Sequence, residues 1–166
     1  MRLNNTKVYK VYLKSLKIRR KYPYPANNLQ YLDMNKIEHI GIAVSDFNAA
    51  CSLYEKLLNT GVYKVEDVES ESVKTAFLQS GPNKIELLEA TNDDSPIAKF
   101  IAKKGEGVHH IAFEVEDIVA EMERLKNEGF VLLSDKPKLG ADNKLVCFVH
   151  PKSAGGVLVE LVQGIG

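Results

Sequence analysis

An internal repeat constrains the fold of this chain more than any other feature of its sequence. Residues 38–46 read EHIGIAVSD, and residues 109–117 read HHIAFEVED. In both segments apolar residues alternate with other residues, which is the period of a half-buried β-strand. The recurrence of this pattern indicates that one supersecondary unit occurs twice in the chain.

The sequence after each repeated segment follows the same order of elements. An apolar stripe with helical spacing comes first, and it ends before Gly61 in the first unit and at Gly129 in the second. Strand candidates separated by turn signals follow. They lie near 63–68, 72–79 and 84–89 in the first unit and near 130–133, 145–149 and 157–162 in the second. Each unit is therefore predicted to be βαβββ.

A βαβββ unit leaves one apolar sheet face uncovered, and two such units placed side by side can curl their sheets around a shared cleft. The sequence thus predicts an α+β fold in which two βαβββ modules form one half-open mixed barrel. We place module one at about 34–90, module two at about 107–163, and a linker helix with Ser95 as its N-cap at about 95–104. These parts form a single domain over 34–166.

The first 33 residues differ from the rest of the chain in charge. They contain eight basic residues and one acidic residue, and they lack apolar periodicity. We interpret residues 1–33 as a basic N-terminal extension that is dispensable for the fold, since Met34 stands just before the first strand. A mitochondrial presequence is the alternative, although presequences are usually serine-rich, and a surface arm is a third. The expected location is cytoplasmic, or the mitochondrial matrix if the extension is a presequence.

The composition of residues 34–166 excludes several classes of partner. They hold 14 basic and 21 acidic residues, which argues against nucleic acid, because phosphate binding requires a clustered basic face. No apolar run approaches the length of a membrane span. Cys51 and Cys147 show no metal or redox spacing, and a reducing compartment fits them.

Two histidines and two glutamates occupy equivalent places in the two modules. His39 and His110 stand early in the first strand of each module, and Glu86 and Glu160 stand in the last. Strand alternation places His39 and His110 on the cleft side and His109 on the helix side. A lone strand histidine or glutamate is more often structural, but the repetition of both favours a site where four side chains meet.

This donor set is typical of a divalent metal ion. Two imidazoles and two carboxylates without a thiolate suit six-coordinate Co, Mn, Ni, Fe or Zn, with two positions left for water or substrate. Zinc held by four protein ligands would more often be a closed structural site. A buried carboxylate without a cation would also cost free energy. The pattern therefore predicts a metal centre that can bind a ligand through two oxygens.

Beyond these four positions, the sequence resembles methylmalonyl-CoA epimerases of the vicinal-oxygen-chelate (glyoxalase) superfamily over about 34–163. The histidine and glutamate positions alone point only to the superfamily, whereas the longer motifs are more specific to the epimerases. The motifs are HIGIAV at 39–44, KIELLE at 84–89, DSPIAKF at 94–100, GVHHIAFEV at 107–115, PKLGA at 137–141 and HPKSAGGVLVEL at 150–161.

The resemblance implies that His39, Glu86, His110 and Glu160 hold a divalent metal ion. It implies an acyl-CoA substrate, a homodimer, and a reaction that interconverts (R)- and (S)-methylmalonyl-CoA by moving the proton at C2. Glu160 matches a residue to which the family's proton transfer is assigned, which makes it the candidate catalytic residue.

The second acid/base group is left unassigned between two candidates. Some family members have a glutamate on the strand where Lys74 stands in this chain, and Glu71 lies just before it. A lysine could move a proton if the metal or burial lowered its pKa, but Lys74 could equally be an ordinary solvated lysine or contact the CoA phosphates.

Three rival functions share the expected fold. A lactoylglutathione lyase uses a similar metal site on a glutathione hemithioacetal, and the epimerase-like motifs argue against it. Ring-cleaving dioxygenases of the superfamily use iron with two histidines and one glutamate, and Glu86 as a fourth ligand argues against them. A metal-free binding protein of the antibiotic-sequestering kind would not need all four ligand residues.

Overall fold

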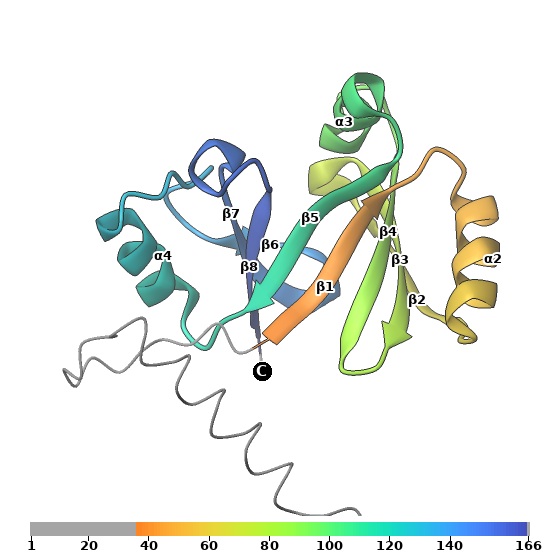
Figure 1. Cartoon of the computed structure of the whole chain (residues 1–166), viewed down its shortest axis with the longest axis horizontal. Helices are drawn as coiled ribbons and strands as arrows, with labels where there is room; N and C mark the ends of the chain where they lie inside the picture. The colour runs from red at the N-terminus through yellow and green to blue at the C-terminus, as the bar shows by residue number, and fades with distance from the viewer. Residues whose placement is uncertain (1–35, 166) are drawn as a thin grey trace, which may run out of the picture. The chain divides into compact units, whose positions relative to one another are not determined.

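A computed structural model describes residues 36–165 of the chain (Figure 1). The interpretation of residues 1–33 as a dispensable extension falls outside these described residues and stays a prediction. Within them, no helix is long and apolar enough to cross a membrane.

The two predicted βαβββ modules are present, joined by the expected linker helix. Module one consists of β1 (Lys36–Ala43), α2 (Phe47–Leu58), β2 (Val62–Val68), the short 3-10 helix η1 (Glu69–Glu71), β3 (Val73–Ser80) and β4 (Asn83–Ala90). The linker is α3 (Pro96–Lys104), capped by the Ser95 side chain. Module two consists of β5 (Gly107–Glu114), α4 (Ile118–Asn127), β6 (Lys138–Leu139), η2 (Ala141–Asn143), β7 (Lys144–Val149), η3 (Pro151–Ser153) and β8 (Val159–Gly164).

The prediction of a strand near residues 130–133 in module two is wrong. The segment near 130–133 forms only an isolated bridge between Leu132 and Val149, and the two-residue β6 takes the place of the expected strand. Among the described residues, only two backbone hydrogen bonds join this segment to β7 and the residue after it, from Leu133 to Phe148 and from His150 to Val131.

The two modules share one sheet of eight strands in the order β2-β3-β4-β1-β5-β8-β7-β6. Within each module the first strand pairs with the last in parallel, β1 with β4 and β5 with β8, and the modules meet where β1 and β5 pair antiparallel. Figure 1 shows the sheet curling into a half-open barrel. The predicted α+β half-barrel is therefore confirmed.

Each module buries the face of its sheet that its own helix covers. Phe47 and Ala50 of α2 pack on Ala76, Leu78 and Leu87. In module two, α4 packs on β7 and β8 through a cluster that comprises Ile118, Met122, Leu125, Cys147, Val149 and Leu161. Because strand side chains alternate between faces, the other face of both half-sheets is left to line a common cleft.

Candidate functional site

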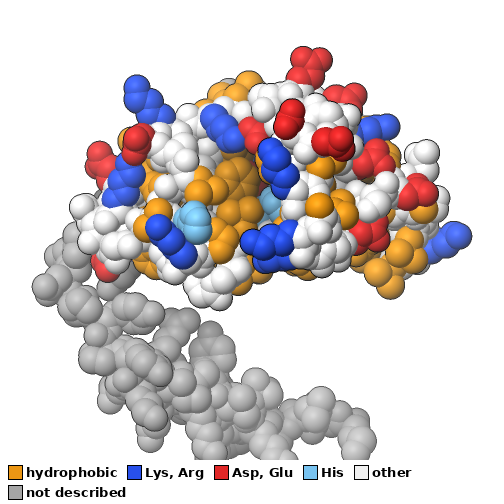
Figure 2. Space-filling model, turned by 90° about the horizontal axis from the view of Figure 1, so that it is seen from above, with side chains coloured by type: hydrophobic (Ala, Val, Ile, Leu, Met, Phe, Trp, Pro, Cys, Tyr) orange, Lys and Arg blue, Asp and Glu red, His pale blue; other side chains and the backbone are white. Residues whose placement is uncertain are grey.

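A cavity of about 280 Å³ lies on the concave face of the sheet and is lined by residues of both modules. Its size is close to the lower end of the range for small-molecule pockets. Figure 2 looks into this hollow, where apolar side chains and histidine are visible and lysines stand on the rim. All four predicted ligand residues line the cavity, so the structure brings together what the repeat predicted.

The four residues come from four neighbouring strands at the centre of the sheet. Glu86 lies on β4, His39 on β1, His110 on β5 and Glu160 on β8. Gly41 pairs with both Glu86 and His110, and it leaves the space that the His110 ring occupies. A Cβ on Gly41 would lie 2.2 Å from Cε1 of that ring. The glycine therefore serves close approach rather than an unusual backbone conformation.

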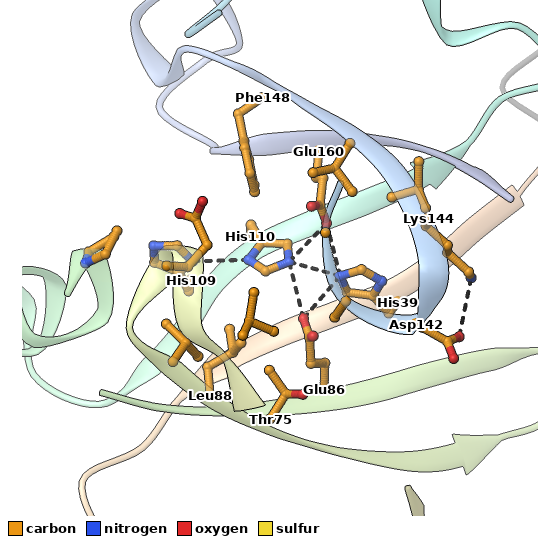
Figure 3. A pocket seen from close by; sticks show the side chains of 18 of the residues that line it. His39, Thr75, Glu86, Leu88, His109, His110, Asp142, Lys144, Phe148 and Glu160 are labelled. Carbon is orange, nitrogen blue, oxygen red and sulfur yellow. Dashed lines mark hydrogen bonds and ion pairs between the residues drawn. The ribbon is translucent and has the colours of Figure 1, made fainter. Parts of the chain in front are cut away.

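The donor atoms of these side chains meet at one point (Figure 3). The Nε2 atom of His39 lies 2.8 Å from Nε2 of His110, 3.2 Å from Oε2 of Glu86 and 3.0 Å from Oε2 of Glu160. The Nε2 atom of His110 lies 3.6 Å from Oε2 of Glu86 and 3.3 Å from Oε2 of Glu160. All four residues are buried, and their side chains form one compact N/O cluster.

The cluster fits a divalent cation. Atoms that bind one ion at about 2.1 Å and at right angles lie about 3.0 Å apart, which is close to the separations above. Oε2 of Glu160 is buried without a hydrogen-bond partner among the described residues, since neither nearby imidazole reaches it in hydrogen-bond geometry. Single donor atoms of His39, His110 and Glu160 all lie within 4.8 Å of one another. Glu86 stands outside this tighter group but approaches both imidazoles.

The charges of the cluster also favour a cation. Burial alone would lower the pKa of His39, but Glu160, Glu38 and Glu86 outweigh it and raise this pKa well above its ordinary value. Burial alone would raise the pKa of Glu160, but His110 and His39 lower it to about 2. The carboxylates thus favour positive charge at the centre of the cluster, which a divalent cation can supply.

Two β-bulges place a second polar residue behind each histidine. The β1–β5 register shifts once at Glu38 and once at His109, which are the residues before His39 and His110. At a β-bulge, two residues of one strand lie opposite one residue of its partner, which changes the direction of a side chain. Both Glu38 and His109 line the cavity. The prediction that His109 faces the helix side is therefore wrong, because simple alternation fails at a bulge.

Glu38 and His109 each contact the ring nitrogen that faces away from the cluster. Oε2 of Glu38 lies 2.6 Å from Nδ1 of His39, and Nδ1 of His109 lies 2.9 Å from Nδ1 of His110. Burial, with the charge of His110, lowers the pKa of His109 to about 4, so His109 is neutral at pH 7 and can accept a hydrogen bond. Sequence reasoning missed this pair, although the repeat aligns Glu38 with His109.

The two candidates for a second acid/base group lie on different faces of the sheet. Lys74 points to the helix-covered face, where its Nζ lies 4.4 Å from the centre of the Phe47 ring, while its neighbour Thr75 lines the cavity. Glu71 of η1 lines the cavity and forms an ion pair with Lys138 of β6. Of the two candidates, only Glu71 lines the cavity.

A family model described as the Glyoxalase/Bleomycin resistance protein/Dioxygenase superfamily matches residues 38–148. This chain belongs to that superfamily. Among curated relatives, the mitochondrial methylmalonyl-CoA epimerase of Mus musculus is 38% identical over 154 residues, which cover 90% of this chain and 86% of the relative. The ethylmalonyl-CoA/methylmalonyl-CoA epimerase of Cereibacter sphaeroides is 43% identical over 132 residues, which cover 78% of this chain and 98% of the relative.

Solved structures of methylmalonyl-CoA epimerases are also similar to this chain. A variant of Streptomyces coelicolor methylmalonyl-CoA epimerase in complex with 2-nitronate-propionyl-CoA has a TM-score of 0.77 and 36% identity, with 81% of this chain and all of that chain covered. A methylmalonyl-CoA epimerase in complex with methylmalonyl-CoA and NH4+ has a TM-score of 0.75 and 38% identity, with 79% of this chain and 95% of that chain covered.

Proposed function

We propose that this protein is a methylmalonyl-CoA epimerase, which interconverts the (R) and (S) forms of its substrate by moving the proton at C2. One observation carries the proposal: His39, Glu86, His110 and Glu160 converge in the cavity of a chain whose relatives, matched over most of their length, are named epimerases. The rival lyase, dioxygenase and binding functions have no comparable support.

We propose His39, Glu86, His110 and Glu160 as the ligands of a divalent metal ion. When bound, the ion would stabilise the negative charge that develops on the thioester oxygen as the C2 proton leaves. The donor set contains nitrogen and oxygen but no thiolate, which favours Co, Mn, Ni or Zn. Apolar side chains such as Leu88 line the same cavity, and they exclude water from the reacting carbon.

Epimerisation requires a base on one face of the planar intermediate and an acid on the other. We assign these roles to Glu160 and Glu71. Glu160 belongs to β8 of module two and Glu71 to η1 of module one, and both line the same cavity. Lys138 holds Glu71 in an ion pair that must open for the proton to move.

The proposal extends to the partners and location of the protein. The acyl-CoA substrate is supported by the ligands of two similar solved structures. We propose a homodimer by analogy with the family, which light scattering of the purified protein would test. We propose the cytoplasm as its location, or the mitochondrial matrix if residues 1–33 are a presequence.

Hydrogen exchange tests the proposed reaction directly. Purified protein loaded with Co²⁺ is mixed with (R)- or (S)-methylmalonyl-CoA in deuterated water, and the C2 proton is followed by NMR. We expect metal-dependent loss of this proton from both epimers. A metal-loaded protein that leaves it in place, or that instead converts a glutathione hemithioacetal, would contradict the proposal. A pure protein that binds no divalent metal would favour the binding function.

A further inference from the structure

Glu38 is a buried carboxylate that no step of the proposed reaction uses. One of its oxygens accepts a hydrogen bond from Nδ1 of His39 at 2.6 Å. The other lies 2.6 Å from Nζ of Lys84 and contacts Nζ of Lys144. Glu38 is only 4% exposed, so these three contacts replace the water that a carboxylate would otherwise bind.

The lysines around Glu38 do not form a free anion site. Asp142 lies 2.9 Å from Lys84 and 3.7 Å from Lys144, and it also pairs with Lys64 at 3.0 Å. Lys64 in turn pairs with Glu66. Three lysines thus face three carboxylates, Glu38, Glu66 and Asp142, and the network is neutral. Because these charges balance, the network offers no surplus positive charge to a negatively charged ligand, and Glu38 itself is held by Lys84 and Lys144.

The contact between Glu38 and His39 determines how that imidazole meets the cluster. Because the carboxylate accepts a hydrogen bond from Nδ1, Nδ1 would keep its proton when a metal ion takes the place of the proton on Nε2. The Nε2 atom, which lies next to Glu86 and Glu160, would then be the atom that binds the ion. A ring turned over about its Cβ–Cγ bond would lose this hydrogen bond. The negative charge behind the ring also increases the basicity of Nε2.

We propose that Glu38 is a positioning residue for the metal centre, which fixes the orientation and tautomer of His39 while Lys84 and Lys144 hold its carboxylate in place. The proposal rests on the metal site assigned under the proposed function. The donors of His39, Lys84 and Lys144 surround the buried carboxylate on both of its oxygens.

Metal affinity measures this role independently of turnover. Co²⁺ is titrated into the full-length protein in competition with a chromophoric chelator, for the wild type, Glu38→Gln and Glu38→Ala. Glutamine keeps an acceptor oxygen and loses the charge, whereas alanine loses both. We expect affinity to fall in that order, by roughly 10-fold to 100-fold overall, as for other groups that orient a metal-binding histidine.

Asp142→Asn is the matched control, because Asp142 contacts the same two lysines without contacting a histidine. We expect it to bind Co²⁺ as the wild type does. In zinc-loaded protein, the Nδ1–H resonance of His39 should persist in Asp142→Asn and disappear or shift strongly in Glu38→Ala. If Glu38→Ala does not fold, Glu38→Gln/Lys144→Gln also removes the charge of one of the two lysines that Glu38 contacts, and it is measured in the same way.

The outcomes separate this proposal from the proposed function. Wild-type Co²⁺ affinity in every folded Glu38 variant, or an equal loss in Asp142→Asn, would overturn the positioning role while leaving the metal site intact. A wild-type protein that binds no Co²⁺ would instead overturn the metal site itself.

Discussion

Replacing Gly41 by alanine should displace His110 while leaving the fold intact. The added Cβ would lie 2.2 Å from Cε1, 2.6 Å from Nδ1 and 2.7 Å from Nε2 of the His110 ring, whereas ordinary contacts begin at 3.4 Å. The ring must therefore move by about 1.2 Å, the difference between 3.4 and 2.2 Å. Metal–ligand bonds tolerate about 0.2 Å, so His110 could not remain a ligand without distortion of the site.

The expected effect of Gly41→Ala is larger on function than on stability. Overpacking costs about 1–3 kcal/mol of unfolding free energy, and the gain from replacing a strand glycine offsets about 0.5–1 kcal/mol of it. A misplacement of about 1 Å at a reacting centre costs about 100-fold in rate. We therefore expect a folded protein with weakened Co²⁺ binding and at least that loss in C2 proton exchange.

Gly164→Ala provides the matched control for this experiment. Gly164 also lies in a strand, β8, and a Cβ there meets nothing within 4 Å. Co²⁺ affinity, C2 proton exchange and the urea midpoint are measured for both variants. The reasoning fails if Gly41→Ala binds metal and exchanges the proton as the wild type does, or if Gly164→Ala loses as much function.

Three further substitutions test other parts of the site. Glu160→Gln keeps an oxygen for the metal but loses basicity, so it should retain part of its Co²⁺ and lose roughly 10²–10⁴-fold in proton exchange; near-normal exchange would make Glu160 a ligand only. Glu71→Gln should slow C2 proton exchange, whereas Lys74→Met should leave it unchanged. If Lys74→Met slows exchange and Glu71→Gln does not, Lys74 is the second acid/base group. Lys84 and Lys64 outweigh burial and lower the pKa of Asp142 below its ordinary value, so its stabilising effect is present above that ordinary value and is lost as pH falls through the folded pKa. Asp142→Asn should therefore lower the unfolding free energy of the metal-free protein at neutral pH, and urea titrations should show this deficit shrinking as the solution is made more acidic.

The fold could be predicted from the sequence because its signals are local and occur twice. Alternation identified β1 and β5. In the structure, Asp46 caps α2 and Asp117 caps α4 through their side chains, as helix N-caps commonly do. The strand near 130–133 was predicted wrongly because pairing depends on a partner strand. Its apolar residues pack under α4 without a continuous ladder to β7.

The site was predictable only as far as strict alternation holds. His39 and His110 reach the cleft as alternation requires, and Thr75 does so in place of Lys74 for the same reason. His109 does not follow the rule, because a bulge depends on how two distant strands meet, and one strand's own sequence carries little sign of it. The position of Glu38 in the cavity was not predicted for the same reason, because Glu38 lies at the other bulge.

The repeat brings equivalent donors together, but the surroundings of those donors have diverged between the modules. Behind His39 stands the carboxylate of Glu38 with its lysines, whereas behind His110 stands the neutral imidazole of His109, whose ring meets Phe100 of α3 edge-on. The cavity thus has a charged end and an aromatic end. A twofold-symmetric cavity could bind an unsymmetrical thioester equally well in either direction. Divergence of the two ends would remove that ambiguity. The repeat would then account for the proposed metal site, and its divergence for a single orientation of the proposed substrate.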